Sequence, residues 1–250
     1  MTMNKTADIP SEATMPASRL RILCFHSFRL SGESMRLQLS LFSNFRNTIS
    51  GLVTFDYLNG GNRLPDDAWD EAPQMMRDLF QPPYYEWWNA AENTDGSMTY
   101  DHIEASFDKI EKHISQHGPY DGYLGFSQGG CVAHTLSLLS LRDPAFATRL
   151  PPPRFGIFIS ARTSRHATHA ALVAGAAQAP LSLPSLVIYG GKDTGVPAEL
   201  TEHLMKTLDE TKRVKLYFPD GTHRIPKLDE AQAQVLREFL LAQLEAKRAM

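Results

Sequence analysis

The chain has few cysteines, no excess of basic residues and no long apolar run. Only two cysteines, Cys24 and Cys131, occur in 250 residues, so a disulfide framework is excluded and a reducing compartment is expected. The 25 basic residues are balanced by 28 acidic ones, which gives no electrostatic reason to expect nucleic acid as a partner. No apolar run approaches the roughly 20 residues of a membrane span, and residues 1–18 lack the apolar core of a secretory signal. We therefore expect a cytoplasmic protein without a membrane span.

The apolar content is large enough for a packed core. Hydrophobic residues make up 42% of the chain, which disfavours intrinsic disorder because sufficient apolar surface is available to offset chain entropy. Residues 1–18 are polar and contain proline, so they predict a flexible N-terminal tail. Residues 19–250 predict a single folded domain.

Short apolar runs alternate with amphipathic stretches along most of this domain. The apolar runs have the length and composition of buried strands, and the amphipathic stretches have the three- and four-residue spacing of helices. Strands are predicted at 20–25, 52–57, 120–126, 155–160, 184–189 and 214–218. Helices are predicted at 32–45, 100–117, 128–141, 198–208 and 228–246. The alternation predicts an α/β fold with a mostly parallel central sheet flanked by helices.

The segment 58–98 interrupts this alternation. It carries all three tryptophans, four prolines, and eight acidic residues against two arginines. Two interpretations stay open: a long surface loop whose tryptophan rings fill the core, or a cap over a functional site. The acidic excess further predicts that the segment disfavours substrates with an anionic acyl chain.

A serine stands between a predicted strand and a predicted helix. The sequence there is Gly125-Phe126-Ser127-Gln128-Gly129, followed by Gly130. A serine on a tight strand-to-helix turn adopts a strained backbone conformation, and flanking glycines remove the Cβ atoms that would clash. The helix that follows directs its first N–H groups toward negative charge forming near the serine. We predict that Ser127 is a nucleophile.

A hydroxyl nucleophile requires a base and a group that orients the base. Among nine histidines, His223 follows the last predicted strand, at the carboxyl edge of the sheet where Ser127 must also lie. Asp193, just past the preceding strand, is the predicted acid. Asp220 is the rival, but it is only three residues from His223 and poorly placed to reach the far ring nitrogen.

Charge that develops on a carbonyl oxygen requires hydrogen-bond donors, the oxyanion hole. We predict the backbone N–H groups of Gln128 and of Phe28, in the loop after the first strand. His26 in that loop is expected to be structural. His113 and His117 are expected on a solvated helix face, and His166 and His169 in a surface loop.

Several motifs together resemble the FSH family of serine hydrolases, within the α/β-hydrolase superfamily. They are LRILCFHSF, Glu86-Trp87-Trp88, GFSQGG, SLVIYGGKDTGVP and GTHRIP, within about residues 19–240. The family includes an ovarian-tumour-associated hydrolase and fungal thioesterases that release polyketide chains. The resemblance implies the α/β-hydrolase fold, and the order serine, aspartate, histidine maps onto Ser127, Asp193 and His223. Where the family usually has His-Gly, this chain has His26-Ser27.

These observations predict a hydrolase of carboxylic esters or thioesters that works through an acyl-enzyme on Ser127, with no metal or organic cofactor. Ser27, Trp87 and Trp88 are the predicted substrate-binding residues, and the tryptophans suggest an apolar acyl site. Two alternatives stay open: a non-catalytic binding protein on a hydrolase scaffold, and an acyltransferase that uses the same three residues. Cys131 is expected to pack inward as a small apolar side chain.

Overall fold

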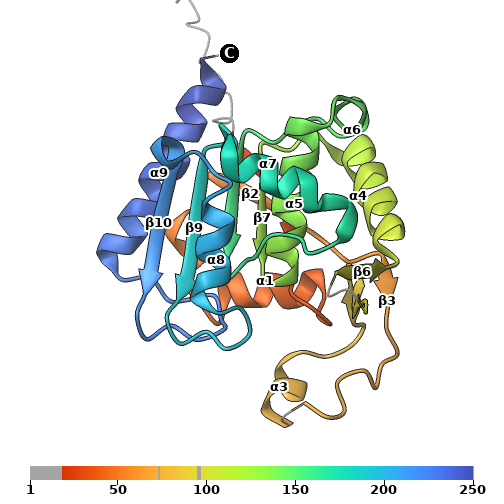
Figure 1. The fold of residues 1–250 in the computed structure, drawn as a ribbon. Coiled ribbons are helices and arrows are strands. Elements are labelled where there is room, and N and C mark those ends of the chain that lie inside the picture. Colours follow the sequence, from red (N-terminus) through yellow and green to blue (C-terminus); the bar gives the residue numbers. More distant parts are fainter. Residues whose placement is uncertain (1–18, 73, 95–96, 250) are drawn as a thin grey trace, which may run out of the picture.

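Six parallel strands form one central sheet in the computed structural model, which describes residues 19–72, 74–94 and 97–249 (Figure 1). The spatial order is β10-β9-β8-β7-β1-β2. The strands are β1 (Leu20–Phe25), β2 (Val53–Leu58), β7 (Gly122–Phe126), β8 (Phe155–Ile159), β9 (Ser185–Gly190) and β10 (Arg213–Phe218). All six predicted strands and the α/β class are confirmed. The predicted tail at 1–18 lies outside the described residues, and the single domain over 19–250 stays a prediction.

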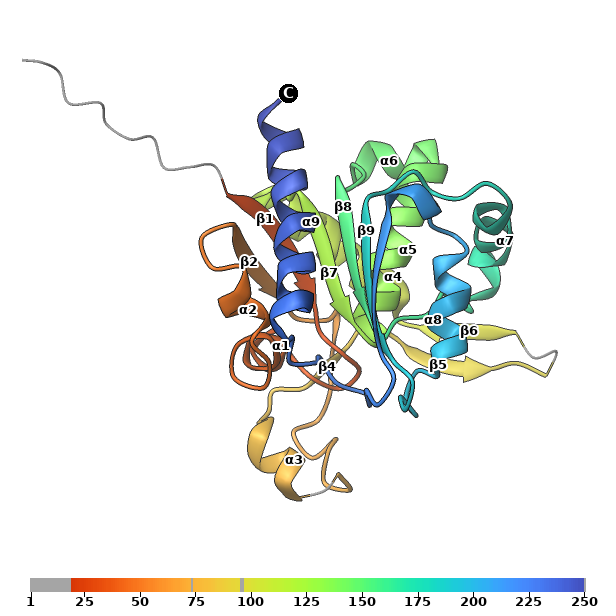
Figure 2. The same ribbon diagram turned by 90° about the vertical axis from the view of Figure 1, so that its left-hand side faces the viewer.

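Helices cover both faces of this sheet (Figure 2). One apolar cluster joins the sheet to α1 (Gly32–Ser40), α2 (Phe45–Thr48) and α9 (Glu230–Arg248). A second cluster joins the other face to α4 (Ile103–His117), α5 (Gln128–Arg142), α7 (Ala170–Gln178) and α8 (Ala198–Met205). α5 is buried along nearly its whole length, because it packs directly against β7 and β8. The strand before Ser127 and the helix after it are therefore held in the centre of the molecule.

Some predicted boundaries were wrong. The helix predicted at 100–117 begins only at Ile103, because Tyr100 lies in β6 (Met98–Asp101), which pairs with β5 (Asn89–Glu92). The helix predicted at 32–45 ends at Ser40, where Ser43 turns the chain by donating its hydroxyl to the Gln38 carbonyl. The short helices α6 (Pro144–Arg149) and α7 were not predicted. α7 is formed mainly by small residues, so its sequence lacks the regular spacing of large apolar side chains by which helices were predicted.

The 58–98 segment lies at the carboxyl ends of the strands, at the lower edge of the sheet in Figure 1. In addition to β5, the segment contains β3 (Asn62–Arg63), α3 (Gln74–Leu79) and β4 (Tyr85–Glu86). β3 pairs with β4, outside the central sheet. This placement brings the segment to the edge where the loops after β1, β7, β9 and β10 converge. Among the described helices none is both long and apolar enough to cross a membrane.

Candidate active site

Ser127 occupies the turn between β7 and α5 in a strained backbone conformation. Its φ of 57° and ψ of −119° lie where side chains are rarely found. Glycine on both sides permits the turn: a Cβ on Gly125 would come within 2.1 Å of the Gly129 carbonyl oxygen, and one on Gly129 within 2.0 Å of the Phe25 carbonyl oxygen. The strand and helix can therefore approach closely only without side chains there, and this close packing holds Ser127 at the tip.

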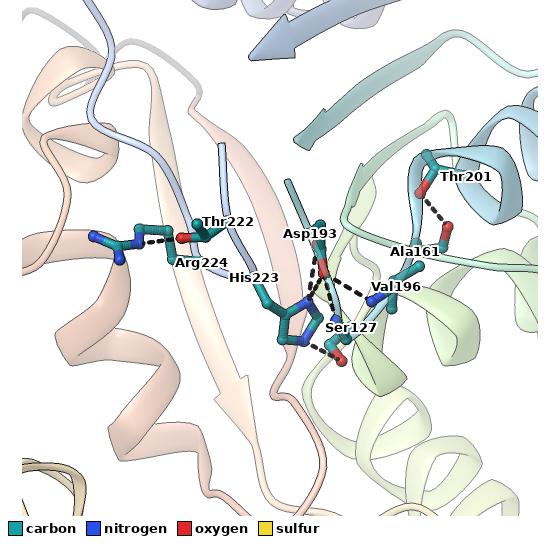
Figure 3. A network of polar contacts seen from close by, with 9 residues as sticks. Ser127, Ala161, Asp193, Val196, Thr201, Thr222, His223 and Arg224 are labelled. Atoms are coloured by element: carbon teal, nitrogen blue, oxygen red, sulfur yellow. Dashed lines mark hydrogen bonds and ion pairs between the residues drawn. The ribbon is translucent and has the colours of Figure 1, made fainter. Parts of the chain in front are cut away.

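The three residues predicted from distant loops lie in one hydrogen-bonded chain (Figure 3). The Ser127 hydroxyl donates to His223 Nε2 over 3.0 Å. His223 Nδ1 is 2.9 Å from each carboxylate oxygen of Asp193. Because a carboxylate only accepts, Nδ1 carries the ring proton, which leaves Nε2 free to accept from the serine. This arrangement suits proton transfer from the hydroxyl to the imidazole.

Asp193 is fixed by its own loop. Its side chain is fully shielded from solvent, whereas that of His223 is 30% exposed. Asp193 Oδ1 also accepts the backbone N–H groups of Gly195 at 2.9 Å and Val196 at 2.8 Å. Figure 3 shows the contact with Val196. The rival Asp220 is exposed and forms an ion pair with Lys192 instead. The structure thus brings Asp193, not Asp220, to the histidine.

The loop after β1 lies against the same site. Phe28 and Gln128 both line the cavity next to Ser127, and neither backbone N–H has a hydrogen-bond partner among the described residues. Both N–H groups are thus available as hydrogen-bond donors beside the serine. His26 braces this loop, since its Nδ1–H donates to the Ser27 carbonyl and its Nε2 accepts the Gly60 N–H. Burial lowers the pKa of His26 to about 4, so the ring is neutral.

The side chain of Gln128 has a connecting role that sequence reasoning missed. Its Oε1 accepts the Trp87 N–H at 3.1 Å, and its Nε2 donates to the Trp88 carbonyl at 2.8 Å. The first residue of α5 thus ties the 58–98 segment to the serine turn. The only sequence signal for this role is that Gln128 is a polar residue next to the nucleophile. The groups that its side chain contacts lie about 40 residues earlier in the chain and could not be identified from the sequence.

A cavity of about 540 Å³ opens beside Ser127 and His223. Much of its wall is apolar or aromatic, with Leu30, Trp69, Met76, Trp88, Tyr100 and Cys131. Ser27 also lines it, and the Trp88 ring stacks on Tyr100 with centroids 4.6 Å apart.

The prediction that Trp87 contacts substrate is contradicted by its position. Trp87 is fully buried, and its indole N–H donates to the His26 carbonyl, so it supports the loop from behind the cavity wall. The 58–98 segment therefore contributes both to the core and to the site: Trp87 fills the core, while Trp69 and Trp88 line the cavity.

Other predictions can be compared with the structure. Cys24 and Cys131 are free and buried, and burial raises the pKa of Cys131 to about 11, so the thiol packs as a neutral group as expected.

His169 is not a surface residue: it is buried and its Nδ1 pairs with the Ser164 hydroxyl. His113 is partly buried against Asp56, at 2.9 Å, and not on a fully solvated face. Among the described residues no cluster of three or more side chains suited to a metal occurs.

Two cationic residues of the cavity were also missed. Arg162 and Arg165 follow β8 and reach the cavity from that side. The rule that loops after parallel strands share one edge points to them as much as to Asp193 and His223. They were overlooked because an arginine in a polar loop carries no motif.

The sheet, its flanking helices and the serine turn define an α/β-hydrolase. Solved structures with this fold include the crystal structure of esterase PE8, at 18% identity and a TM-score of 0.57 over 90% of this chain and 93% of that one. Acyl-protein thioesterase 2 from Zea mays has a TM-score of 0.55 at 15% identity, over 90% of this chain and 94% of that one.

The sequence comparisons identify the family. The signature described as "Serine hydrolase (FSH1)" matches residues 15–235, and the chain belongs to this family. It is similar to esterase C25G4.2 of Caenorhabditis elegans, with 28% identity over 92% of this chain and 96% of the relative. Esterase OVCA2 of Bos taurus is 29% identical over 88% of this chain and 95% of the relative. The protein is a serine hydrolase that cleaves carboxylic esters or thioesters.

Proposed function

We propose that hydrolysis proceeds through an acyl-enzyme on Ser127, with His223 as general base and acid and Asp193 as the residue that orients it. The observation that carries this proposal is the 3.0 Å contact between Ser127 Oγ and His223 Nε2. His223 takes the hydroxyl proton as Oγ bonds to the carbonyl carbon, and the resulting imidazolium returns that proton to the leaving alcohol or thiol.

The second half of the reaction reverses these roles. Water donates a proton to His223 Nε2 as its oxygen attacks the acyl carbon. The imidazolium then returns that proton to Ser127 Oγ as the bond between Oγ and the acyl carbon breaks, so the carboxylic acid leaves and the free serine is restored. In both halves the N–H groups of Phe28 and Gln128 donate to the oxyanion. The α5 N-terminus adds a favourable partial positive charge there.

The cavity supports a small-molecule substrate with an apolar acyl chain. Leu30, Met76 and the stacked pair Trp88 and Tyr100 provide an apolar surface that extends from the serine. The net charge of −3 supports such a substrate over a nucleic acid. A cytoplasmic location is part of the same proposal, supported by the two free cysteines.

A fluorophosphonate probe and a panel of p-nitrophenyl esters and acyl thioesters of graded chain length test the proposal. The wild type is expected to form an adduct on Ser127, identified by mass spectrometry of the tryptic peptide. Ser127→Ala is expected to lose the adduct and to lower kcat by about 10⁴-fold or more.

Ser160→Ala provides the matched control, because Ser160 is buried at the end of the neighbouring strand β8 and has a similar positive φ of 43°. This variant is expected to keep the adduct. An adduct on another residue, or esterase activity that survives in Ser127→Ala, would overturn the assignment.

A further inference from the structure

Two arginines at the cavity have no anionic partner in the described part of the chain. Arg162 and Arg165 both line the cavity that contains Ser127. Neither takes part in a salt bridge among the described residues. Most exposed arginines need no partner, but Arg162 is only partly exposed and its Nε atom is completely buried without a hydrogen bond. A buried guanidinium N–H with no acceptor is costly.

The surroundings of Arg162 increase this cost. Burial and the nearby positive charge of Arg165 both lower the pKa of Arg162, which reports a desolvated cation next to a second one. No aspartate or glutamate is found among the residues that line this cavity. The same holds for a second cavity, of about 400 Å³, on the other side of the two arginines. The pair is therefore a concentrated positive charge at the wall of a site with no carboxylate to neutralise it.

The backbone that carries Arg162 is fixed in place. Ala161 is fully buried, and its carbonyl accepts the Thr201 hydroxyl at 2.8 Å, as Figure 3 shows. The Arg165 N–H donates to the Tyr100 hydroxyl at 2.7 Å, so Arg165 is joined to the aromatic wall. A fixed backbone lowers the conformational entropy that these residues lose when a ligand binds.

None of the acidic residues that the structure describes in the 58–98 segment lines this cavity. Asp67, Asp70 and Glu71 lie around a separate surface hollow next to Arg29. The residues that this segment contributes to the cavity are instead uncharged, among them Trp69, Met76 and Trp88. The sequence-based expectation that the segment disfavours anionic acyl chains therefore loses its physical basis.

We propose that Arg162 and Arg165 bind an anionic group of the substrate, so that the preferred ester or thioester carries a carboxylate or phosphate in its acyl chain or in its leaving group. This inference rests on the proposed function of the Ser127 site and adds a substrate class to it. An arginine fork matches the geometry of a carboxylate or phosphate with two parallel N–H donors.

Two matched pairs of substrates test the proposal and separate the two sources of the anion. Mono-p-nitrophenyl succinate and p-nitrophenyl butyrate differ only by a terminal carboxylate in the acyl chain. Butyryl-4′-phosphopantetheine and butyryl-pantetheine differ only by a phosphate in the leaving group. In one of the pairs the wild type is expected to show kcat/KM higher for the anionic member by roughly tenfold or more, a typical gain for hydrogen bonds between charged groups.

The ratio of kcat/KM within that pair is the quantity to compare between variants. Arg162→Gln is expected to lower the ratio by roughly tenfold, and Arg162→Lys to restore only part of it, because an ammonium lacks the planar fork. A variant that folds poorly loses activity toward both substrates of the pair equally. The ratio of kcat/KM therefore reports substrate recognition and not folding. Arg237→Gln makes the same change in net charge in α9, where Arg237 is partly exposed, pairs with Glu230 and does not line the cavity, so this variant should keep the wild-type ratio.

Salt provides an independent readout. The preference of the wild type for the anionic substrate is expected to decline as the ionic strength rises, because salt screens the attraction between the substrate anion and the arginines. A wild type that hydrolyses both neutral substrates but favours neither anionic one would overturn the anion site and leave the Ser127 mechanism intact. Absence of hydrolysis of all four substrates, together with no fluorophosphonate adduct, would overturn the proposed function itself.

Discussion

Asp193 shows how one side chain can serve both its loop and the proposed reaction. Its Oδ1 accepts two backbone N–H groups while both oxygens face His223 Nδ1. An asparagine in its place can keep the backbone contacts through its single oxygen. Its amide nitrogen would then point a donor at Nδ1, which favours the tautomer with the proton on Nε2, unable to accept from Ser127.

Asp193→Asn is therefore expected to lower kcat by about 10⁴-fold, as a corresponding change does in serine proteases, with little loss of stability. Ester hydrolysis and urea denaturation measure the two effects. Asp220→Asn is the matched control, because Asp220 is exposed and pairs only with Lys192; its activity should stay close to wild type. Equal losses in the two variants would contradict the role given to Asp193.

Residues with a motif could be predicted, and residues without one could not. Ser127 was found from its glycine-flanked pentad, and Asp193 and His223 from their positions after consecutive strands. The roles of the Gln128 side chain and Arg162 depend on which groups lie opposite them, and these partners come from other parts of the chain. Trp87 was misjudged for the same reason, because burial against β1 decides its role.

At the scale of elements, the close approach of α5 to β1 positions the serine turn. Gly129→Ala would place a methyl group within 2.0 Å of the Phe25 carbonyl and 2.5 Å of the His26 carbonyl. Backbone must shift to make room. We expect a loss of about 1–3 kcal/mol in the free energy of unfolding and a fall of roughly 10²-fold in fluorophosphonate labelling rate, because small displacements spoil reacting geometry.

Gly175→Ala is the control for the same chemical change. Gly175 lies in α7, and a Cβ there meets nothing within 4 Å. Alanine has the higher helix propensity, so this variant should gain about 0.5–1 kcal/mol and keep its labelling rate. Urea denaturation of both variants measures whether the free energy of unfolding falls in Gly129→Ala and rises in Gly175→Ala. A neutral effect of Gly129→Ala would show that the turn does not depend on close packing.

The elements themselves were predictable to different degrees. The four inner strands β1, β7, β8 and β9 were recognisable because buried parallel strands are nearly continuous apolar runs. The two-residue strands β3 and β4 were not, since a pair so short has no periodicity and is formed by contacts with the rest of the fold.

For the whole molecule, three buried histidines predict acid sensitivity. Burial lowers the pKa of His26, His134 and His169 to about 4 from an ordinary value of 6.5. The unfolded chain therefore binds protons below pH 6.5 that the folded chain does not, until about pH 4. Stability is full above pH 6.5 and falls as the pH drops through this window, by up to about 1.4 kcal/mol per pH unit for each histidine.

Urea denaturation between pH 7 and pH 4.5 measures this slope. His134→Gln removes one of the three groups and keeps a hydrogen-bonding side chain near the Thr207 hydroxyl, which His134 contacts at 2.7 Å. The variant is expected to show a slope smaller by about 1.4 kcal/mol per pH unit, whatever its stability at pH 7. An unchanged slope would contradict the buried, neutral state of His134.

The sequence by itself determined the α/β class, the order of the strands along the chain and the three residues proposed for acyl transfer. These features depend on local composition and on the rule that parallel strands end at one edge. The tertiary structure decided the rest: which tryptophan fills the core, which lines the cavity, and the position of two arginines beside the serine that form no salt bridge in the described part of the chain. Such properties arise from contacts between residues far apart in the chain, because burial and the absence of a counter-charge exist only once those segments have packed together.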